Sequence, residues 1–444
     1  MDEPRWTCAR ETSVALDLLL TVGLLLSTAS QLRPDGAPVG PAEICLLVWV
    51  LLTFSREIAR LGPPLTPALS RLLTFWLLFA VALCIGTMTA YVLGDRHDPA
   101  LFAHDIGAYL LAAALSGLMV VEPGAAARLQ RIAWLSATLG AAWLIIQVAF
   151  GWGLLDPGEY DTWEWDRFRG FSDNSNQLAL YCAVLVPLSL HLADSARRHG
   201  ERITALICMM VAIIVGRLTK SDAFLLVLLA AGPLFGVFKL WKWLMSRERK
   251  MLLRSAFAWL LVMALPLTIA YATPLGSTLA AELEDFAKGM TKGGGGRDTD
   301  ETARLRFEVW NGALRRGIDA GLLGLGPGPH LEIPQSIVAG RRDSTNAPKH
   351  EEHPKFGVIP NFEAHNTFLD LFVQGGFIAV LNFGWLLAVT LLATRRAEQD
   401  ALTALVCGLA IFIGFHFDVR HPIFWFAISL CLIAPRRVPA ARGG

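Results

Sequence analysis

Residues 71–94 read RLLTFWLLFAVALCIGTMTAYVLG, and no charged residue follows Arg71 in this stretch. A helix needs about 20 mostly apolar residues to cross the hydrocarbon core of a bilayer. Inside that core every backbone polar group must find its partner within the protein, so an uncharged run of this length is typical of a helix. The stretch therefore predicts a transmembrane helix.

The same pattern recurs on both sides of this stretch. Of the 444 residues, 54% are hydrophobic and 17% are charged, and the mean hydropathy is +0.47. Soluble domains carry about 25% charged residues. The expected fold is therefore all-α, a polytopic membrane protein with about 12 transmembrane helices in a single membrane domain over 1–444. The expected spans are 13–32, 38–56, 71–94, 103–122, 130–152, 176–194, 203–219, 222–241, 255–275, 366–393, 399–416 and 422–435.

Lysine and arginine are unevenly distributed between the two ends of these spans. If the N-terminus lies inside, the inner segments hold 21 Lys and Arg and the short outer segments hold 7. Short loops rich in these residues stay in the cytoplasm. We therefore expect both termini in the cytoplasm and one large loop, 276–365, outside.

Composition also argues against several function classes. The formal net charge of +1 gives no electrostatic reason to expect nucleic-acid binding. The seven cysteines are scattered without a CxxC pair, and the large loop has none. This arrangement argues against a disulfide framework or a cysteine-bound metal. We expect no cofactor.

The large loop contains one periodic segment. Its apolar residues recur at helical spacing and predict an amphipathic helix over 303–318 that follows a cap at Thr299 or Asp300. The residues expected on its apolar face are Leu305, Val309, Ala313, Leu314 and Ile318. Such a helix lies either on the membrane or on the helix bundle. The glycines of GLLGLGPGPH, at 321–330, favour a turn with close backbone approach.

Positive charges stand on the outer side, where the orientation rule expects few. They are Arg167 and Arg169 before the sixth span, Arg217 and Lys220 after the seventh, Arg304 and Arg306 on the loop helix, and Arg420 between the last two spans. Arginine suits phosphate because it donates two parallel hydrogen bonds. The set is a candidate site for an anionic group. The alternative is that these side chains only extend to water at the membrane surface.

His365 begins HNTFLDLFVQGG, where the loop returns to the membrane. An imidazole titrates near neutral pH and can act as a general base, although a capping or interfacial histidine is the alternative. The loop also carries HEEH at 350–353, followed by Pro354. Its histidines are three residues apart, whereas the HExxH zinc motif needs four. We expect no metal site.

Three motifs between 163 and 390 follow one another in a recognisable order. RFRGFSDNSNQLA begins at Arg167, RFEVWNGAL begins at Arg306 and is followed by GLLGLGPG, and HNTFLDLFVQGGFIA begins at His365. Together they resemble the motifs of the bacterial O-antigen ligase and polymerase family. The residues that fall on the family pattern are Arg167, Gly170, Asn174, Asn176, Arg306, Trp310, Gly324, Gly326, Gly328, His365, Asn366 and Gly376.

The sequence departs from the family pattern at several positions. Ser175 replaces the usual Pro between two Asn residues, and Asp222 stands where the family often has Arg. The third cation is therefore open between Arg217 and Lys220. Ala379 ends the histidine motif where ligases often have Gly, Thr or Tyr. The closing RHPIFWF looks more like exopolysaccharide polymerases than ligases.

The resemblance implies an all-helical glycosyltransferase of C type in the bacterial inner membrane, acting on the periplasmic side without a metal. The donor would be a glycan on undecaprenyl diphosphate, and the acceptor another glycan or lipid A-core. His365 would be the catalytic base and Arg167 and Arg306 the diphosphate clamp. Further substrate-binding residues would be Arg217 or Lys220, Arg420, Asn176 and Asn366.

Two questions remain open from the sequence. The first is polymerase or ligase, with a slight lean to polymerase from the RHPIFWF ending. The second is a different class altogether, a multi-span secondary transporter or an exporter of lipid-linked glycan. Transporters of that size usually rest on internal repeats, and no repeat is visible here.

Overall fold

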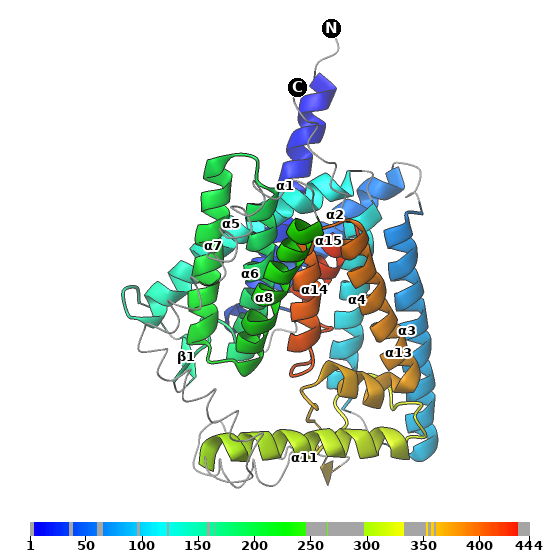
Figure 1. The fold of residues 1–444 in the computed structure, drawn as a ribbon. Helices are drawn as coiled ribbons and strands as arrows, with labels where there is room; N and C mark the ends of the chain where they lie inside the picture. The colour runs from blue at the N-terminus through cyan, green and yellow to red at the C-terminus, as the bar shows by residue number, and fades with distance from the viewer. Residues whose placement is uncertain are drawn as a thin grey trace.

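The structure is a computed structural model of the full chain. It describes residues 4–34, 39–59, 65–95, 98–121, 124–156, 158, 160–164, 166–245, 264, 297–332, 352–353, 357–358 and 361–433. The described helices are α1 Pro4–Leu26, α2 Pro41–Ala59, α3 Pro67–Leu93, α4 Pro99–Val121, α5 Ala125–Gly151, α6 Ser175–Ser195, α7 His199–Leu218, α8 Asp222–Met245, α11 Arg297–Asp319, α13 Thr367–Arg396, α14 Asp400–Phe412 and α15 Pro422–Leu432, with a 3-10 turn at Ser30–Leu32. Apart from α11, they form one bundle (Figure 1).

A helix lies over eleven of the twelve expected spans, and the twelfth, 255–275, lies outside the described residues apart from residue 264. In the described part, α3, α4, α5, α6, α8 and α13 are long and apolar enough to cross a membrane. The chain is therefore a mostly helical membrane protein. Helix α14, with 13 residues, is about 20 Å long, which is shorter than a bilayer core of about 30 Å.

Residues 71–93 form most of α3, and the two ends of this helix follow simple rules. Thr66 caps the helix by accepting a hydrogen bond from the backbone N–H of Leu69, and Pro67 is the first helical residue. Proline suits this position because its missing N–H would have no partner there. Gly94 ends the helix with φ of +67°, a conformation that favours glycine.

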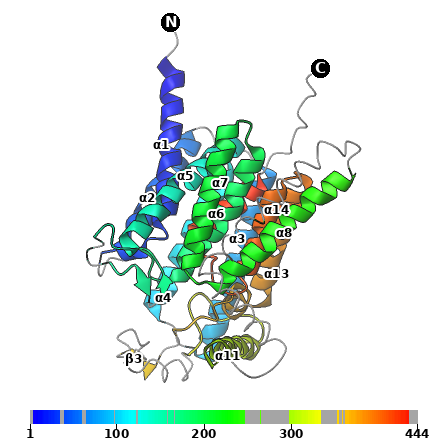
Figure 2. The same cartoon turned by 60° about the vertical axis from the view of Figure 1, so that its left-hand side comes forward.

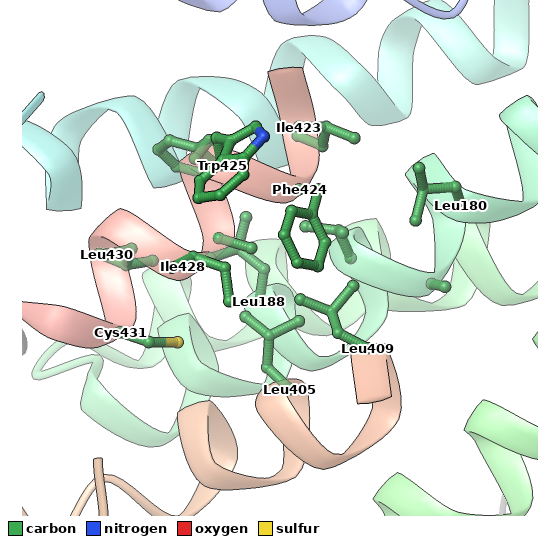
Figure 3. Close-up of a cluster of buried hydrophobic side chains, with 14 of the residues drawn as sticks. Leu180, Leu188, Leu405, Leu409, Ile423, Phe424, Trp425, Ile428, Leu430 and Cys431 are labelled. Atoms are coloured by element: carbon green, nitrogen blue, oxygen red, sulfur yellow. The ribbon is translucent and has the colours of Figure 1, made fainter. Parts of the chain in front are cut away.

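Helix α6 lies at the centre of the bundle, and 89% of its most apolar window is buried inside the protein. Figure 3 shows Leu180 and Leu188 of α6 beside Leu405 and Leu409 of α14 and the apolar residues of α15. The outer helices instead leave large apolar side chains exposed, such as Leu51 of α2, Leu77 of α3 and Ile207 of α7. An apolar outer surface is what a lipid environment requires.

Helix α11 lies across one end of the bundle (Figures 1 and 2). The first turn of α1 lies at the opposite end. Helix α11 begins at Arg297, before the expected caps Thr299 and Asp300, which are therefore inside the helix. Asp300 therefore lies in the first turn of α11, where the helix dipole stabilises an acidic side chain.

The expected single apolar face of α11 is divided in two. Val309 and Ala313 are buried in a small core, whereas Leu314 and Ile318 are 46% and 53% exposed. Residues 309 and 313 are four apart and face the bundle, and 314 and 318 form a neighbouring row turned by about 100°. Helix α11 thus packs on the bundle and presents a second apolar row outward.

The glycine segment after α11 docks on a break in α13. Gly376 has φ of +64° and interrupts the helix. The carbonyls of Val373 and Gln374 therefore accept from the backbone N–H groups of Leu325 and Gly326, at 2.8 and 2.7 Å. A Cβ on Gly326 would lie 2.6 Å from Thr87 Oγ1, so only glycine fits this close approach.

Two short antiparallel strand pairs complete the described fold. β1 (Trp163–Glu164) pairs with β2 (Arg167–Phe168), with Glu164 opposite Arg167. β3 (Glu352–His353) pairs with β4 (Gly357–Val358) inside the large loop. The all-α expectation holds for the bundle, and the strands occur only in the connections.

Candidate active site

Five segments that are far apart in the sequence meet at the end of the bundle that carries α11. They are β2 with the start of α6, the turn between α7 and α8, α11 itself, the residues before α13, and the turn between α14 and α15. One hydrogen bond joins β2 to the α7–α8 turn, from Arg167 to Thr219, and two more join α11, the residues before α13 and the α14–α15 turn, from Trp310 to Ala364 and from Asn366 to Gly414. The two groups approach each other closely enough for Arg306 to affect the pKa of Arg167. These segments carry all the cations expected at the site, including Arg304 of α11, whose side chain is not among the described ones.

Arg167 is held between α6 and the α7–α8 turn. Its Nε donates to the carbonyl oxygen of Thr219 at 3.1 Å, and its Nη2 donates to Asn176 Oδ1 at 2.9 Å. Burial lowers the pKa of the guanidinium; Glu164 and Asp222 oppose this, and the positive charge of Arg306 adds to it. Asn176 thus acts as an orienting partner for Arg167, at the start of a helix capped by Asn174.

Arg306 comes to the site from α11. Its guanidinium carbon lies 5.7 Å from the ring centroid of Phe415, in the α14–α15 turn, within the range of a cation–π contact. One helical turn later, Trp310 Nε1 donates to the carbonyl oxygen of Ala364 at 3.1 Å. Among the described residues, no carboxylate lies within ion-pair distance of Arg306. A guanidinium in a cation–π contact keeps N–H groups that can donate to an anion.

His365 lies directly before α13, next to Asn366, which caps the helix. The residue is exposed, with its ring 5.2 Å from that of Phe362. Although His365 has surface open to solvent, the protein packed around its imidazole desolvates the ring and lowers its pKa; Glu363 opposes this, and Arg306 and Arg420 add to it. The imidazole is therefore neutral near pH 7, the form that a general base requires.

Arg420 is engaged by two carboxylates of the protein. Its Nη1 donates to Asp105 Oδ1 of α4 at 2.6 Å, and its Nη2 donates to Glu363 Oε1 at 2.5 Å. Burial alone would lower the pKa of Arg420, but Glu363 and Asp105 raise it above its usual value. The structure thus gives Arg420 a bridging place between α4, the residues before α13 and the α14–α15 turn.

The two alternatives for a further cation lie in different surroundings. Lys220, with φ of +50°, pairs with Asp166 beside β2. Arg217 is buried in the last turn of α7. Asp222, which stands in the family's arginine position, is close enough to Arg167 to affect its pKa. Among the described residues, neither Lys220 nor Arg217 offers an unpaired charge at the position of Asp222, where the family often has an arginine.

The other expected contacts of the site are used inside the protein. Asn366 Oδ1 accepts from the backbone N–H groups of Phe368 and Leu369, and its Nδ2 donates to the carbonyl oxygen of Gly414 at 2.8 Å. Arg169 donates to Asp161 at the rim. Both side chains therefore shape the site's border.

Sequence reasoning missed several polar residues near Arg420. Burial raises the pKa of Asp418 to about 8 and lowers that of His421 to about 4, so both are largely uncharged at pH 7. Burial and Arg306 together lower the pKa of His416 well below its usual value. Glu363 and Asp105 were missed as well. The cluster HFDVRHP, at 416–422, is polar for a stretch between two apolar spans and was the available signal.

The described residues include no group of three or more His, Cys, Asp or Glu arranged to hold a metal ion. Most of the HEEH stretch lies outside the description. What the described site offers is cationic: two arginines from distant segments beside a neutral imidazole. Such an arrangement can hold an anion and remove a proton next to it.

Comparison with known protein families gives a match over part of the chain. Residues 204–384 match a family model described as O-antigen ligase. The matched segment includes Arg217, Lys220, Arg306, His365 and Asn366, whereas Arg167 and Asn176 lie before it and Arg420 after it. No curated protein and no solved structure matches the chain.

Proposed function

The chain carries an O-antigen ligase domain at residues 204–384, and from this premise we propose that it transfers a glycan from an undecaprenyl-diphosphate donor to an acceptor hydroxyl. The family supports glycan transfer in general. The donor, the periplasmic side and the roles of individual residues are our proposal, argued below from the arrangement of the site.

The observation that carries the proposal is the mutual placement of Arg167 and Arg306. They come from β2 and α11. They lie near enough to each other that the positive charge of Arg306 lowers the pKa of Arg167. Two like charges repel each other, and an anion bound near both would offset that repulsion. A diphosphate has the charge and the oxygens that two guanidinium groups bind best.

We assign the base to His365. The acceptor hydroxyl gives its proton to the neutral imidazole while its oxygen attacks the anomeric carbon of the donor sugar. The bond between that carbon and the diphosphate oxygen breaks, and Arg167 and Arg306 stabilise the charge that develops on the leaving diphosphate. Direct displacement of this kind inverts the anomeric configuration. No metal is needed because the arginines supply the positive charge.

A lipid-linked donor fits the place of the site. The five segments meet at one end of a helix bundle whose outer surface is apolar, and α11 lies across that end with an exposed apolar row. With both termini in the cytoplasm, this end faces the periplasm of the inner membrane, where nucleotide sugars are absent. The sugar must therefore arrive already activated on a lipid.

The acceptor divides the proposal into a polymerase, which extends another lipid-linked glycan, and a ligase, which uses lipid A-core. We favour the polymerase because the RHPIFWF ending, which forms the turn and helix that begin at Arg420, looks more like the ending of exopolysaccharide polymerases than of ligases. A multi-span transporter or exporter is the alternative from another class. A transporter would move the lipid-linked glycan without breaking its bond to diphosphate.

The deciding experiment uses purified protein in vesicles with lipid-linked glycan and no nucleotide. One arm offers a second lipid-linked glycan as acceptor, and the other offers lipid A-core. Longer glycan in the first arm supports the polymerase, and glycan on lipid A-core supports the ligase. Movement of donor across the vesicle membrane with its glycosyl-phosphate bond intact, in the absence of any transfer, would instead favour the transporter.

A further inference from the structure

Residues 363–366 are attached to several other parts of the protein. Glu363 accepts from Arg420 at 2.5 Å, the carbonyl oxygen of Ala364 accepts from Trp310 Nε1 at 3.1 Å, and Asn366 Nδ2 donates to Gly414 at 2.8 Å. His365 stands in the middle of this anchored segment. Its position therefore depends on how firmly the residues on each side are held.

The attachment closest to His365 comes from Asp370, in the first turn of α13. Its Oδ1 accepts from the backbone N–H of Ala364 at 2.7 Å, and its Oδ2 accepts from the backbone N–H of Asn366 at 3.1 Å. One carboxylate therefore holds the amide before His365 and the amide after it. The Asp370 side chain is itself buried, so the clamp is shielded from water.

His365 needs such a clamp because of its backbone conformation. Its φ is +51°, in the left-handed region that residues with a Cβ seldom adopt. A strained conformation of this kind persists only where the surrounding structure fixes it. Two amides held by one buried carboxylate provide that constraint on both sides of the residue.

We propose that Asp370 is a positioning residue for His365, and that it works by holding the amides of Ala364 and Asn366 so that the imidazole points at the acceptor hydroxyl. The proposal rests on the proposed function of His365 as base. Asp370 does not touch the donor in this scheme, because Arg167 and Arg306 hold the diphosphate. Its loss should therefore slow the chemical step and leave donor binding intact.

A carboxylate is the side chain that this clamp requires. Both backbone groups are donors, so each needs an acceptor oxygen. In Asp370→Asn one oxygen remains, but the new amino group faces a backbone N–H and cannot accept from it. The substitution keeps the size of the side chain and removes one arm of the clamp. It therefore tests the hydrogen bonds with little change in packing.

The first experiment measures the clamp without reference to activity. Hydrogen–deuterium exchange of the intact protein, followed by mass spectrometry, reports on the peptide that covers 361–369. We expect exchange at this peptide to be about tenfold or more faster in Asp370→Asn than in the unmodified protein. Asn382→Ala is the matched control, because Asn382 is also buried in α13 but donates to the carbonyl oxygen of Phe75. It should leave the peptide unchanged.

The second experiment asks whether the clamp acts through His365. Asp370→Asn should lower kcat by about tenfold to a hundredfold, the effect expected when a catalytic group is misplaced by about 1 Å. The donor KM should stay within about threefold. In a protein that already carries His365→Ala, adding Asp370→Asn should cause little further loss, because residues that act as one unit give non-additive effects.

The outcomes separate the two proposals. If exchange at 361–369 is the same in Asp370→Asn and the unmodified protein, the clamp is wrong whatever the enzyme does. If exchange rises but Asp370→Asn costs as much with His365→Ala as without it, Asp370 does not act through His365. If the clamp exists and the unmodified protein transfers no glycan, the proposed function fails, and with it the link to catalysis.

Discussion

Arg420 forms ion pairs with Glu363 at 2.5 Å and with Asp105 at 2.6 Å, which join the residues before α13 to helix α4. The sequence placed Arg420 among the groups that bind substrate. Its two carboxylate partners give Arg420 a place inside the protein as well, whether or not it binds substrate. A guanidinium that already donates to two carboxylates has less capacity for a phosphate.

This arrangement predicts different results for Arg420 and for the clamp arginines. Arg420→Ala leaves Asp105, which is buried, with His104 but without its arginine, and breaking a buried ion pair costs about 3–5 kcal/mol. We expect a lower thermal unfolding midpoint for purified Arg420→Ala, measured by circular dichroism in detergent. Arg169→Ala is the control, since its partner Asp161 is exposed. Equal midpoints for Arg420→Ala and Arg169→Ala would show that the ion pairs of Arg420 do not stabilise the protein.

Arg167 and Arg306 should instead affect the donor. A hydrogen bond to a charged group contributes about 1.5–3 kcal/mol, so replacing either arginine with Ala should weaken donor turnover by roughly tenfold or more. Lys should restore only part of this, since it carries the charge without the planar fork. Turnover of lipid-linked donor at matched protein amount is the measurement. Normal turnover in both Ala variants would remove the clamp from the mechanism.

The break in α13 predicts a specific glycine requirement. A Cβ at Gly376 would lie 2.6 Å from the backbone carbon of Leu323, and its φ of +64° already disfavours other residues. Gly376→Ala should therefore lower the thermal unfolding midpoint by several degrees. Gly384, in the same helix, has no atom within 4 Å of an added Cβ, so Gly384→Ala should be neutral or slightly stabilising. A Gly376→Ala midpoint as high as that of Gly384→Ala would contradict the docking of the glycine segment.

The orientation of the bundle can be tested by labelling. Single cysteines at Thr299, in α11, and at His199, at the start of α7, lie in segments that the charge distribution places on opposite sides of the membrane. An impermeant thiol reagent added to whole spheroplasts should modify the cysteine at 299 and spare the one at 199. The reverse pattern would put the arginines and His365 in the cytoplasm and exclude a periplasmic reaction.

Most of the fold could be predicted from the sequence because hydrophobic length is a local property. The run after Arg71 forms α3, and a helix lies over every other expected span that the structure describes. The two-sided face of α11 could not be predicted. Whether Leu314 and Ile318 are covered depends on where the bundle meets the helix, which no local pattern records.

The site was predictable in part for the same reason. Arg167 and Arg306 could be recognised as positive charges on the outer side of the membrane, where few are expected. His365 could be recognised as a histidine at a membrane boundary. Glu363 and Asp105 did not, because their meaning comes from Arg420, which is 57 and 315 residues away in the sequence. Asp370 was visible as a charge in a span, but its role depends on two backbone amides that only the folded chain brings to it.

The most direct measurement concerns His365 as the base. Single-turnover transfer with donor already bound should fall by about 10²–10⁴-fold in His365→Ala, whereas binding of the donor should stay near normal because the arginines remain. In the unmodified protein the rate should be flat near pH 7 and fall on acidification, as the imidazole is protonated. Because burial lowers the pKa of His365, that fall should occur below the ordinary histidine value of 6.5. A His365→Ala variant that transfers glycan at a near-normal rate, with the same pH dependence as the unmodified protein, would contradict the assignment of His365 as the base.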